Sequence, residues 1–597
     1  MTIFYKKGFF IAIFLFFVKI SVFSQVIPFE QNSNRSATCV EAIEYYKYLA
    51  KAYKKNIRIE NNGATDSEWP LQTIVIANRK AFTPELVRAQ GKCVLLISNG
   101  IHPGESDGID ASMLFVRDLL QKPDYQHLLD HVTIVVIPVY NIDGALNRNT
   151  SSRANQNGPE AYGFRGNGQN LDLNRDFVKC DTRNAQSFNS LFTHWMPDVM
   201  IDNHVSNGAD YQYVMTLIPT EHSKLAKPLA DYLDTEMLPN LYKNMAKTAY
   251  ELSPYVNSLD YDNEIPDVKG IAGFMDSPRY STGYAALHHC IGFMPETHML
   301  KPYKDRVLST YQLMFEMLKI IDNQHVMILN AKQKAIEEAK TKRDFPIRWA
   351  LDESRVDSLL FKGYAAKWKP SDISGLPRLW YDRAVPYTKN IPYFGHYKAT
   401  LSVTKPKAYI VPKAWYKVLA RLQQNGVKLQ PLTHDTMLNV EIYTIKDMKT
   451  ATTAYEGHYV HSKVEVESKQ TQKTYTKGDY WVSMSQDANR FALETLEPQS
   501  PDSYFAWNYF DGILMPKEYF STYVFEDLAA QYLASQPNLQ AEFKAKQTSD
   551  KVFAADAAAQ LDWVYKRSPY YYDRNAFMVY PVGRVVRDDV RNNIPKF

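Results

Sequence analysis

The chain has 597 residues, of which 45% are hydrophobic and 22% are charged, and its formal net charge is +4. This length exceeds what one hydrophobic core usually supports, so we expect two or three domains. The charge gives no basic surface for nucleic acid, and the sequence has no zinc-finger spacing, Gly-rich phosphate loop or internal repeat. Nucleic acid is therefore not expected as a partner.

Residues 1–24 have the pattern of an export signal peptide. Lys6 and Lys7 precede an apolar run over 9–18, and "VFS" comes just before Gln25. The apolar run is about half of the ~20 residues that a membrane span requires. We therefore expect cleavage after residue 24, a periplasmic or extracellular protein, and no stable membrane anchor after cleavage. The four scattered cysteines do not form a disulfide framework and are expected to be mostly buried thiols.

Strand-like and helix-like segments alternate from about residue 40. The apolar runs "KCVLLIS" (92–98) and "VTIVVIPVYN" (132–141) are typical of strands buried on both faces, and "DASMLFVRDLL" (110–120) has helical spacing. The pattern predicts an α/β fold with a mostly parallel or mixed twisted sheet flanked by helices. Helical spacing over 303–343 predicts a long helix that closes this domain.

Beyond about residue 345 the composition shifts to strands rich in Trp, Tyr and Thr. Residues 407–432 read as a strand, a helix, a glycine stop and a strand, and 478–498 read as a strand that leads into a helix. We predict a first domain over 25–345, which follows the signal peptide, and a smaller accessory region of α/β and β-rich structure over 346–597.

Four side chains suited to metal binding or acid–base chemistry follow predicted strands. His102 and Glu105 lie in a loop after 92–98, His204 ends "DVMIDNH", and Glu296 ends "CIGFMPE". We expect them to meet, because ligand sites of open α/β sheets lie at the carboxyl ends of the strands. Two histidines and one carboxylate are the ligand set of a catalytic zinc site with one open position. A further carboxylate is needed as general base, because an activated water must lose a proton, and Glu296 suits that role.

The ordered motifs "HPGE" (102–105), "NLDLNRDF" (170–177), "DNHVSNG" (202–208) and "GFMPETHM" (292–299) resemble the zinc metallocarboxypeptidase family typified by pancreatic carboxypeptidase A. The resemblance covers roughly residues 40–325. It implies one zinc ion per chain, a peptide or protein substrate, and the same ligands and base. It also implies that Asp172 orients His102 and that Asn174 and Arg175 hold the C-terminal carboxylate of a peptide. The family uses an upstream arginine to stabilise the oxyanion, and we choose Arg153 over Arg148 for this role. A tyrosine of the family closes over the substrate, which here implies Tyr284 or Tyr280.

Two positions depart from the pattern of the family. Gly104 stands where the family often has an arginine, and Val205 stands where it often has a serine. We predict an exported zinc metallocarboxypeptidase that hydrolyses the C-terminal peptide bond. One alternative is a zinc amidase, deacylase or cell-wall peptide hydrolase of the same fold. Another is a non-catalytic peptide- or glycan-binding protein, against which the intact Glu296 argues. Side-chain preference and oligomeric state are not readable from the sequence.

Overall fold

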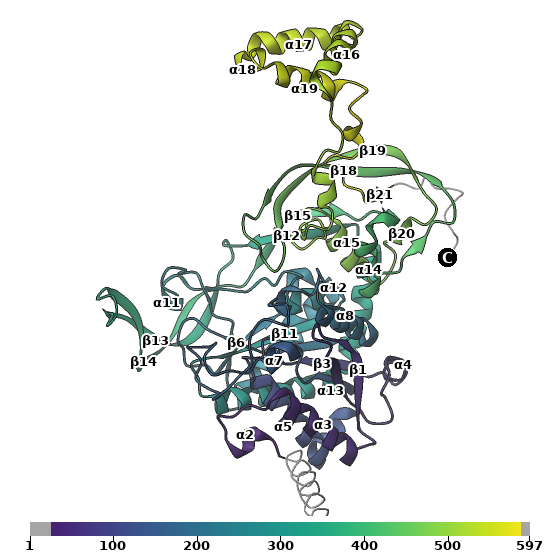
Figure 1. The fold of residues 1–597 in the computed structure, drawn as a ribbon. Helices are drawn as coiled ribbons and strands as arrows, with labels where there is room; N and C mark the ends of the chain where they lie inside the picture. Colours follow the sequence, from purple (N-terminus) through teal and green to yellow (C-terminus); the bar gives the residue numbers. More distant parts are fainter. Residues whose placement is uncertain (1–25, 587–597) are drawn as a thin grey trace, which may run out of the picture.

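The computed structural model describes residues 26–586 (Figure 1). The predicted signal peptide lies outside these residues and stays a prediction. None of the helices in 26–586 has the combination of length and apolar character needed to cross a membrane.

A mixed sheet forms the centre of the first domain. Its middle strands β4, β3, β5 and β11 are parallel to one another, whereas the strands β1, β2 and β7 are joined by antiparallel pairs. The predicted α/β fold is thus confirmed. The strand order is β1 (Ile57–Ala64), β2 (Pro70–Ile76), β4 (Val132–Ile137), β3 (Cys93–Ser98), β5 (Val199–Asp202), β11 (Ile291–His298), β7 (Met215–Pro219) and β8 (Leu252–Pro254), and the short β6 (His204–Ser206) also pairs with β11.

Alternate residues of the middle strands belong to two different hydrophobic cores. Leu95 and Ile97 of β3 face one core, whereas Val94 and Leu96 face the other. Successive side chains of a strand point to opposite faces, so a strand covered on both sides is apolar throughout. The run "KCVLLIS" is therefore apolar throughout because both faces of β3 are covered.

The first core is covered mainly by helices of the first domain. These are α3 (Cys39–Ala52), α5 (Asp107–Gln121), α9 (Lys227–Tyr232), α10 (Leu238–Met245) and the long α13 (Tyr303–Thr341). Ring contacts such as Phe115 against Phe315, with centroids 4.7 Å apart, join α5 to α13. The long helix predicted over 303–343 is α13.

The second core is shared between the first domain and the later region. It holds Phe188 of α8 (Arg183–Trp195) and Tyr284 of α12 (Ser281–Leu287) together with Val418 of α14 (Tyr416–Gln424) and Phe491 of α15 (Asn489–Leu496). The later region thus packs against α8 and α12 on one side of the central sheet. The predicted boundary at 345/346 falls just inside β12 (Asp344–Leu351) and stays a prediction.

The later region contains a second sheet with the order β17 (Gln430–Pro431), β20 (Tyr480–Ser483), β16 (Ala408–Val411), β21 (Gly583–Val585), β18 (Thr436–Thr450) and β19 (His461–Tyr475). Here β16, α14 and β17 are the strand, helix and strand predicted over 407–432, and β20 and α15 are the elements predicted over 478–498. β12 pairs with β15 (Tyr397–Thr404).

Two parts of the later region stand away from the body of the molecule in Figure 1. One is the long hairpin of β13 (Asp357–Pro370) and β14 (Pro377–Phe394). The other is a helical bundle of α16 (Thr522–Ala534), α17 (Pro537–Ser549), α18 (Lys551–Ala554) and α19 (Ala557–Arg567), which has a small hydrophobic core of its own. All four cysteines are buried free thiols, as predicted.

Candidate metal centre and active site

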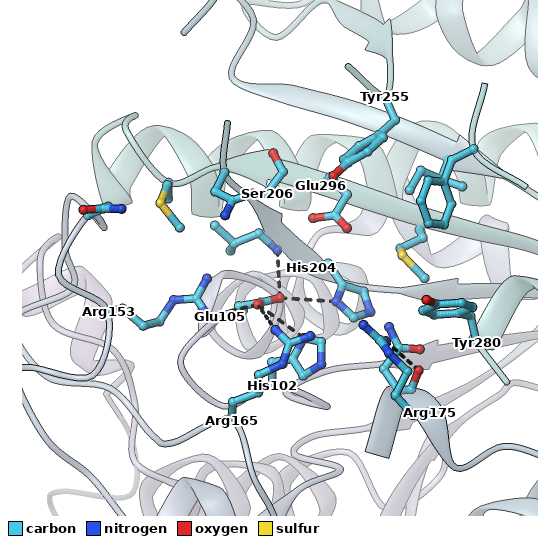
Figure 2. A pocket seen from close by; sticks show the side chains of 18 of the residues that line it. His102, Glu105, Arg153, Arg165, Arg175, His204, Ser206, Tyr255, Tyr280 and Glu296 are labelled. Atoms are coloured by element: carbon cyan, nitrogen blue, oxygen red, sulfur yellow. Dashed lines mark hydrogen bonds and ion pairs between the residues drawn. The ribbon is translucent and has the colours of Figure 1, made fainter. Parts of the chain in front are cut away.

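The three predicted metal ligands meet at the carboxyl edge of the central sheet (Figure 2). His102 and Glu105 lie in the loop between β3 and α5, and His204 begins β6. Their ligand atoms lie within 4.8 Å of one another, and all three residues are buried. The Nδ1 atoms of His102 and His204 lie 3.3 Å and 3.2 Å from the two carboxylate oxygens of Glu105.

A carboxylate behind each histidine fixes the direction of its ring. Nε2 of His102 lies 2.9 Å from Oδ1 of Asp172, and Nε2 of His204 lies 2.9 Å from Oδ2 of Asp202. A carboxylate accepts a hydrogen bond, so each Nε2 carries the proton and each Nδ1 presents a lone pair. His102 Nδ1 is buried without a hydrogen-bond partner. Two imidazole nitrogens and one carboxylate aimed at one point fit a zinc ion.

Glu105 is held in its charged form. Burial by itself raises its pKa, but Arg153 and the two histidines beside it outweigh burial, so the pKa lies well below its usual value. Metal binding requires a deprotonated carboxylate. The surroundings of Glu105 therefore favour the state that a cation needs.

Glu296, the predicted general base, lies beside the ligands because of strand pairing. Its position on β11 is the register partner of His204 on β6. The side chain is 9% exposed, and its Oε2 has no hydrogen-bond partner. Burial raises the pKa of Glu296 to about 8, and the negative charge of Glu105 acts in the same direction, whereas His204 opposes it. This carboxyl group therefore faces the cavity with a free oxygen (Figure 2).

Arg153 reaches the site through the space that Gly104 leaves. Its Nη1 donates to Oε1 of Glu105 at 3.0 Å. A Cβ atom on Gly104 would lie 2.5 Å from Cδ of Arg153, so a side chain there would displace the arginine. The departure from the family pattern at Gly104 thus allows an arginine from another part of the chain to approach the ligand glutamate. Arg148 instead donates to Ser36, away from the ligand cluster.

A second arginine, Arg165, was not among the predicted site residues. Its Nη2 lies 2.9 Å from Oδ2 of Asp172, its Nη1 lies 3.7 Å from Oε1 of Glu105, and it lines the same cavity. The sequence feature that could have indicated Arg165 is its position in the Gly-rich loop "GFRGNG", just before "NLDLNRDF". Asp202 was also not among the predicted site residues. It stands two residues before His204, and its carboxylate contacts the His204 ring.

Arg175 and Tyr280 lie together at another part of the cavity wall (Figure 2). The guanidinium of Arg175 is 4.4 Å from the centre of the Tyr280 ring, and its Nη1 donates to the carbonyl oxygen of Asn174 at 2.8 Å. The side-chain oxygen Oδ1 of Asn174 is buried and has no partner. This end of the cavity therefore has polar groups of Asn174 and Arg175 that can form further hydrogen bonds.

Tyr284, the alternative to Tyr280, does not line the cavity. Its side chain is fully buried in the second core, and its hydroxyl donates to Oδ1 of Asn425 at 2.7 Å. The structure does not support Tyr284 as the residue that closes over the substrate, because Tyr284 lies inside α12 on its core face, whereas Tyr280 is the N-cap of the helix and its extended backbone (φ −96°, ψ 162°) leaves its side chain at the cavity. Tyr280, at the start of the helix, lies at the site.

The cavity itself has a volume of about 520 Å³. Its walls include Tyr255, Phe274 and Asp276, from a segment in which no site residue was predicted. Asp276 is 1% exposed, and its Oδ1 has no hydrogen-bond partner. The cavity thus offers a positive group in Arg175 and a buried carboxyl in Asp276.

The later region also touches the site. Oε2 of Glu456, in the loop between β18 and β19, accepts a hydrogen bond from the backbone N–H of Asp172 at 2.8 Å. In the same loop, His458 lies 2.8 Å from Asp181. A part of the chain with no recognisable site motif therefore supports the residue that orients His102.

The comparisons with known proteins agree with this chemistry. Residues 42–209 match the family model described as zinc carboxypeptidase. These residues belong to the zinc carboxypeptidase family. The predicted resemblance is confirmed, and the protein is a zinc metallocarboxypeptidase, for which zinc is the expected cofactor.

Relatives of this metallocarboxypeptidase cover most of the chain. Carboxypeptidase 2 of Trichophyton tonsurans is 20% identical over 422 residues, which are 68% of this chain and 72% of the relative. Probable carboxypeptidase 2 of Arthroderma benhamiae is 20% identical over 449 residues, 73% and 78% of the two chains. A solved metallo-carboxypeptidase from Pseudomonas aeruginosa matches with 14% identity and a TM-score of 0.36, over 48% of this chain and 69% of that one.

Proposed function

We propose that this metallocarboxypeptidase is exported and removes single residues from the C-terminus of peptides, with Glu296 as general base. One observation carries the proposal. The His102, Glu105 and His204 cluster, a carboxyl group with an unpartnered oxygen and an arginine all line one cavity. A peptide end has a carbonyl that needs activation and a carboxylate that needs a cation, and the cavity offers both.

Each group has a role that its position permits. Zinc held by the cluster would polarise a substrate carbonyl and lower the pKa of a bound water. Glu296 has a free carboxyl oxygen toward the cavity and would accept the proton of the attacking water and pass it to the departing amine. Arg175 would hold the terminal carboxylate, with Asn174 beside it. Asp172 would keep His102 oriented.

The oxyanion that forms on the carbonyl requires a positive group near the metal ligands. Arg153 and Arg165 both line the cavity beside Glu105. Arg153 donates to Glu105 and to Gln156, whereas the Arg165 side chain is 45% exposed. We retain Arg153 as the proposed oxyanion group and include Arg165 in the test: Arg153→Ala should lower kcat more than Arg165→Ala. The reverse order would move the role to Arg165.

Glu296→Gln tests the base, because the amide keeps the shape and removes the proton acceptor. We expect kcat to fall by at least ~10²-fold while zinc stays bound. Zinc content by elemental analysis and peptide hydrolysis are measured on the same samples. Loss of zinc from the variant would instead make Glu296 a metal ligand.

The exopeptidase assignment is tested with one peptide in two forms, as a free acid and as a C-terminal amide. We expect release of single C-terminal residues from the acid and failure on the amide. Arg175→Ala should slow hydrolysis of the acid by about 10–100-fold, because a charge-assisted contact is lost, and should scarcely change the residual rate on the amide. Equal cleavage of both forms, or internal fragments, would favour an amidase or cell-wall peptide hydrolase.

Export is proposed from the pattern of residues 1–24 alone. N-terminal sequencing of the protein recovered from outside the inner membrane of producing cells should start at Gln25. A chain that remains inside the cell with Met1 at its start would refute export and leave the hydrolase intact.

A further inference from the structure

The hairpin of β13 and β14 has an inner half that packs on the molecule and an outer half that projects from it, of which Leu379 and Trp380 line a cavity with Asp210 and Leu300 of the body. In the inner half, Gly363 forms a β-bridge with Tyr211, and Tyr393 pairs with Ile271 of β10 (Ile271–Ala272). Among the described residues, the hydrogen bonds and ion pairs of 366–380 stay within the hairpin itself, as in the ion pair of Lys367 with Asp382. Figure 1 shows this part of the hairpin projecting to the side.

Large apolar side chains gather on the projecting end. Ile373 and Leu376, at the turn, are 97% and 66% exposed. Trp368 and Trp380, on the two strands below the turn, are 54% and 39% exposed. Single exposed apolar residues are ordinary, but four within one hairpin end indicate a contact surface. Tryptophan below an apolar tip is the arrangement that favours the boundary between lipid headgroups and acyl chains.

The backbone at the turn already satisfies most of its own hydrogen bonds. The N–H of Ser371 donates to the carbonyl of Leu376 at 2.8 Å, and the N–H of Gly375 donates to the carbonyl of Ser371 at 2.9 Å. Oγ of Ser371 accepts from the N–H groups of Ile373 and Ser374, both at 3.2 Å. Unsatisfied backbone groups are costly in lipid. This turn can therefore enter an apolar layer without losing many hydrogen bonds to water.

Basic side chains differ between the two halves of the hairpin. In the inner half, Lys362, Arg383 and Lys389 each form an ion pair, with Glu251, Asp210 and Asp267 respectively. In the outer half, Lys367 forms an ion pair with Asp382, but Lys369 and Arg378 face each other across the strands without a carboxylate partner among the described residues, and Nζ of Lys369 lies 5.1 Å from the centre of the Trp380 ring. Like charges directly opposite each other destabilise a strand pair. An anionic partner would relieve this repulsion.

We propose that the β13–β14 tip docks reversibly on an anionic phospholipid surface. Ile373 and Leu376 would enter the layer just below the headgroups, the two tryptophans would lie at the boundary, and Lys369 and Arg378 would contact lipid phosphates. Lys369 and Arg378, which lack a carboxylate partner among the described residues, favour this occupant over a second copy of the chain, whose hairpin would bring the same charges. The contact is peripheral, because a hairpin tip does not span the bilayer.

The test uses the chain from Gln25 onward, so that the apolar run at 9–18 contributes no lipid binding. Vesicles of phosphatidylcholine alone are compared with vesicles of equal parts phosphatidylcholine and phosphatidylglycerol in a flotation assay. We expect binding to the anionic vesicles only, with loss at high salt, because salt screens the lysine and arginine charges. Absence of binding to the anionic vesicles would overturn the proposal.

Two double variants locate the contact. Ile373→Ser with Leu376→Ser should weaken vesicle binding at least tenfold, and Lys369→Ser with Arg378→Ser should weaken it about tenfold. Matched controls on the helical bundle are Val552→Ser, whose side chain is 81% exposed, and Lys544→Ser with Lys551→Ser. The controls should bind like the unmodified chain. All variants should keep the hydrolysis rate on soluble peptides, because none of these residues lines the cavity.

A fluorescent label at Ile373→Cys reports the depth of the tip. All four native cysteines are buried, so labelling is directed to position 373. An environment-sensitive dye there should shift to the blue with anionic vesicles, whereas the same dye at Val552→Cys should not. Unchanged binding in both hairpin variants would refute the proposal. So would a concentration-dependent dimer in sedimentation that Ile373→Ser with Leu376→Ser abolishes, because the tip would then bind a second copy.

Discussion

The first domain and the later region contribute to the site in different ways. The first domain supplies the metal ligands, the carboxylates behind them and the cavity walls, which strands and loops bring together at one edge of the central sheet. Over the described residues up to 586, the later region supplies no cavity wall, yet it packs on the helices at one side of that sheet and binds the backbone of Asp172 through Glu456. A region without a recognisable motif can therefore determine whether a motif elsewhere keeps its geometry.

The shared core indicates that the first domain and the later region depend on each other for packing. Tyr284 and Phe188 of the first domain pack in the same core as Phe491 and Val418 of the later region. The Tyr284 hydroxyl and Asn189 both bond to Asn425. The helical bundle is the opposite case, since its core contains only its own residues.

Truncation after Thr341 should give the largest effect. It would expose many fully buried apolar side chains, each worth about 1.5–3 kcal/mol, whereas a whole domain is stable by about 5–15 kcal/mol. We expect an insoluble or unfolded product by circular dichroism. As control, replacing 519–571 by a short Gly-Ser linker removes the bundle and should leave the melting temperature nearly unchanged. Cooperative unfolding of 26–341 near the temperature of the full chain would mean that the regions are independent.

Loss of a ligand in the first domain should abolish metal binding without loss of the fold. The purified protein should hold about one zinc per chain, and His204→Ala should lose most of it, because a three-ligand site retains only two. Elemental analysis measures the metal, and hydrolysis should fall with it. His222→Ala, outside the cluster, is the control and should retain zinc. Full occupancy in His204→Ala would remove this residue from the ligand set.

Glu456→Ala tests the contact from the later region. Without the acceptor, the Asp172 backbone is less restrained, and we expect zinc affinity and kcat/KM to fall by up to about tenfold, because partners behind metal ligands affect affinity by 10–100-fold. Competition with a chelator measures the affinity, and thermal unfolding checks the fold. Glu456→Gln keeps an acceptor oxygen and should behave almost like the unmodified chain. Equal values for all three proteins would show that the loop only covers the site.

Replacement of Asp276 should give the smallest effect, which we expect on substrate preference and on the pH dependence of that preference. Burial raises the pKa of Asp276 to about 6, while the Thr282 hydroxyl and the charges of Lys224, His204 and Arg175 oppose the shift. The carboxyl is therefore neutral below and charged above that pH, and the charged form stabilises a cation in the cavity. The kcat/KM ratio for peptides that end in Lys over those that end in Leu should rise a few-fold from about pH 5 to about pH 8. Asp276→Asn should flatten this rise, and a flat ratio in the unmodified enzyme would contradict it.

The sequence by itself determined the central elements of the fold and the metal cluster. The apolar runs 92–98 and 132–141 contain β3 and β4, because a strand with two covered faces needs apolar residues throughout. His102 and Glu105 follow β3, His204 comes just after β5, and Glu296 lies near the end of β11. Parallel strands bring these ends to one edge, so the meeting of the four residues followed from their order along the chain.

Only the tertiary structure decided which side chains complete the site. The sequence did not distinguish Tyr280 from Tyr284, but Tyr280 is the extended N-cap of α12 and lines the cavity, whereas Tyr284 lies within the helix and packs in the core. Arg153 reaches Glu105 because Gly104 leaves space, and Glu456 meets Asp172 across 284 residues of chain. Such contacts depend on how loops and regions pack together, and periodicity and motif spacing carry information only about near neighbours in the chain.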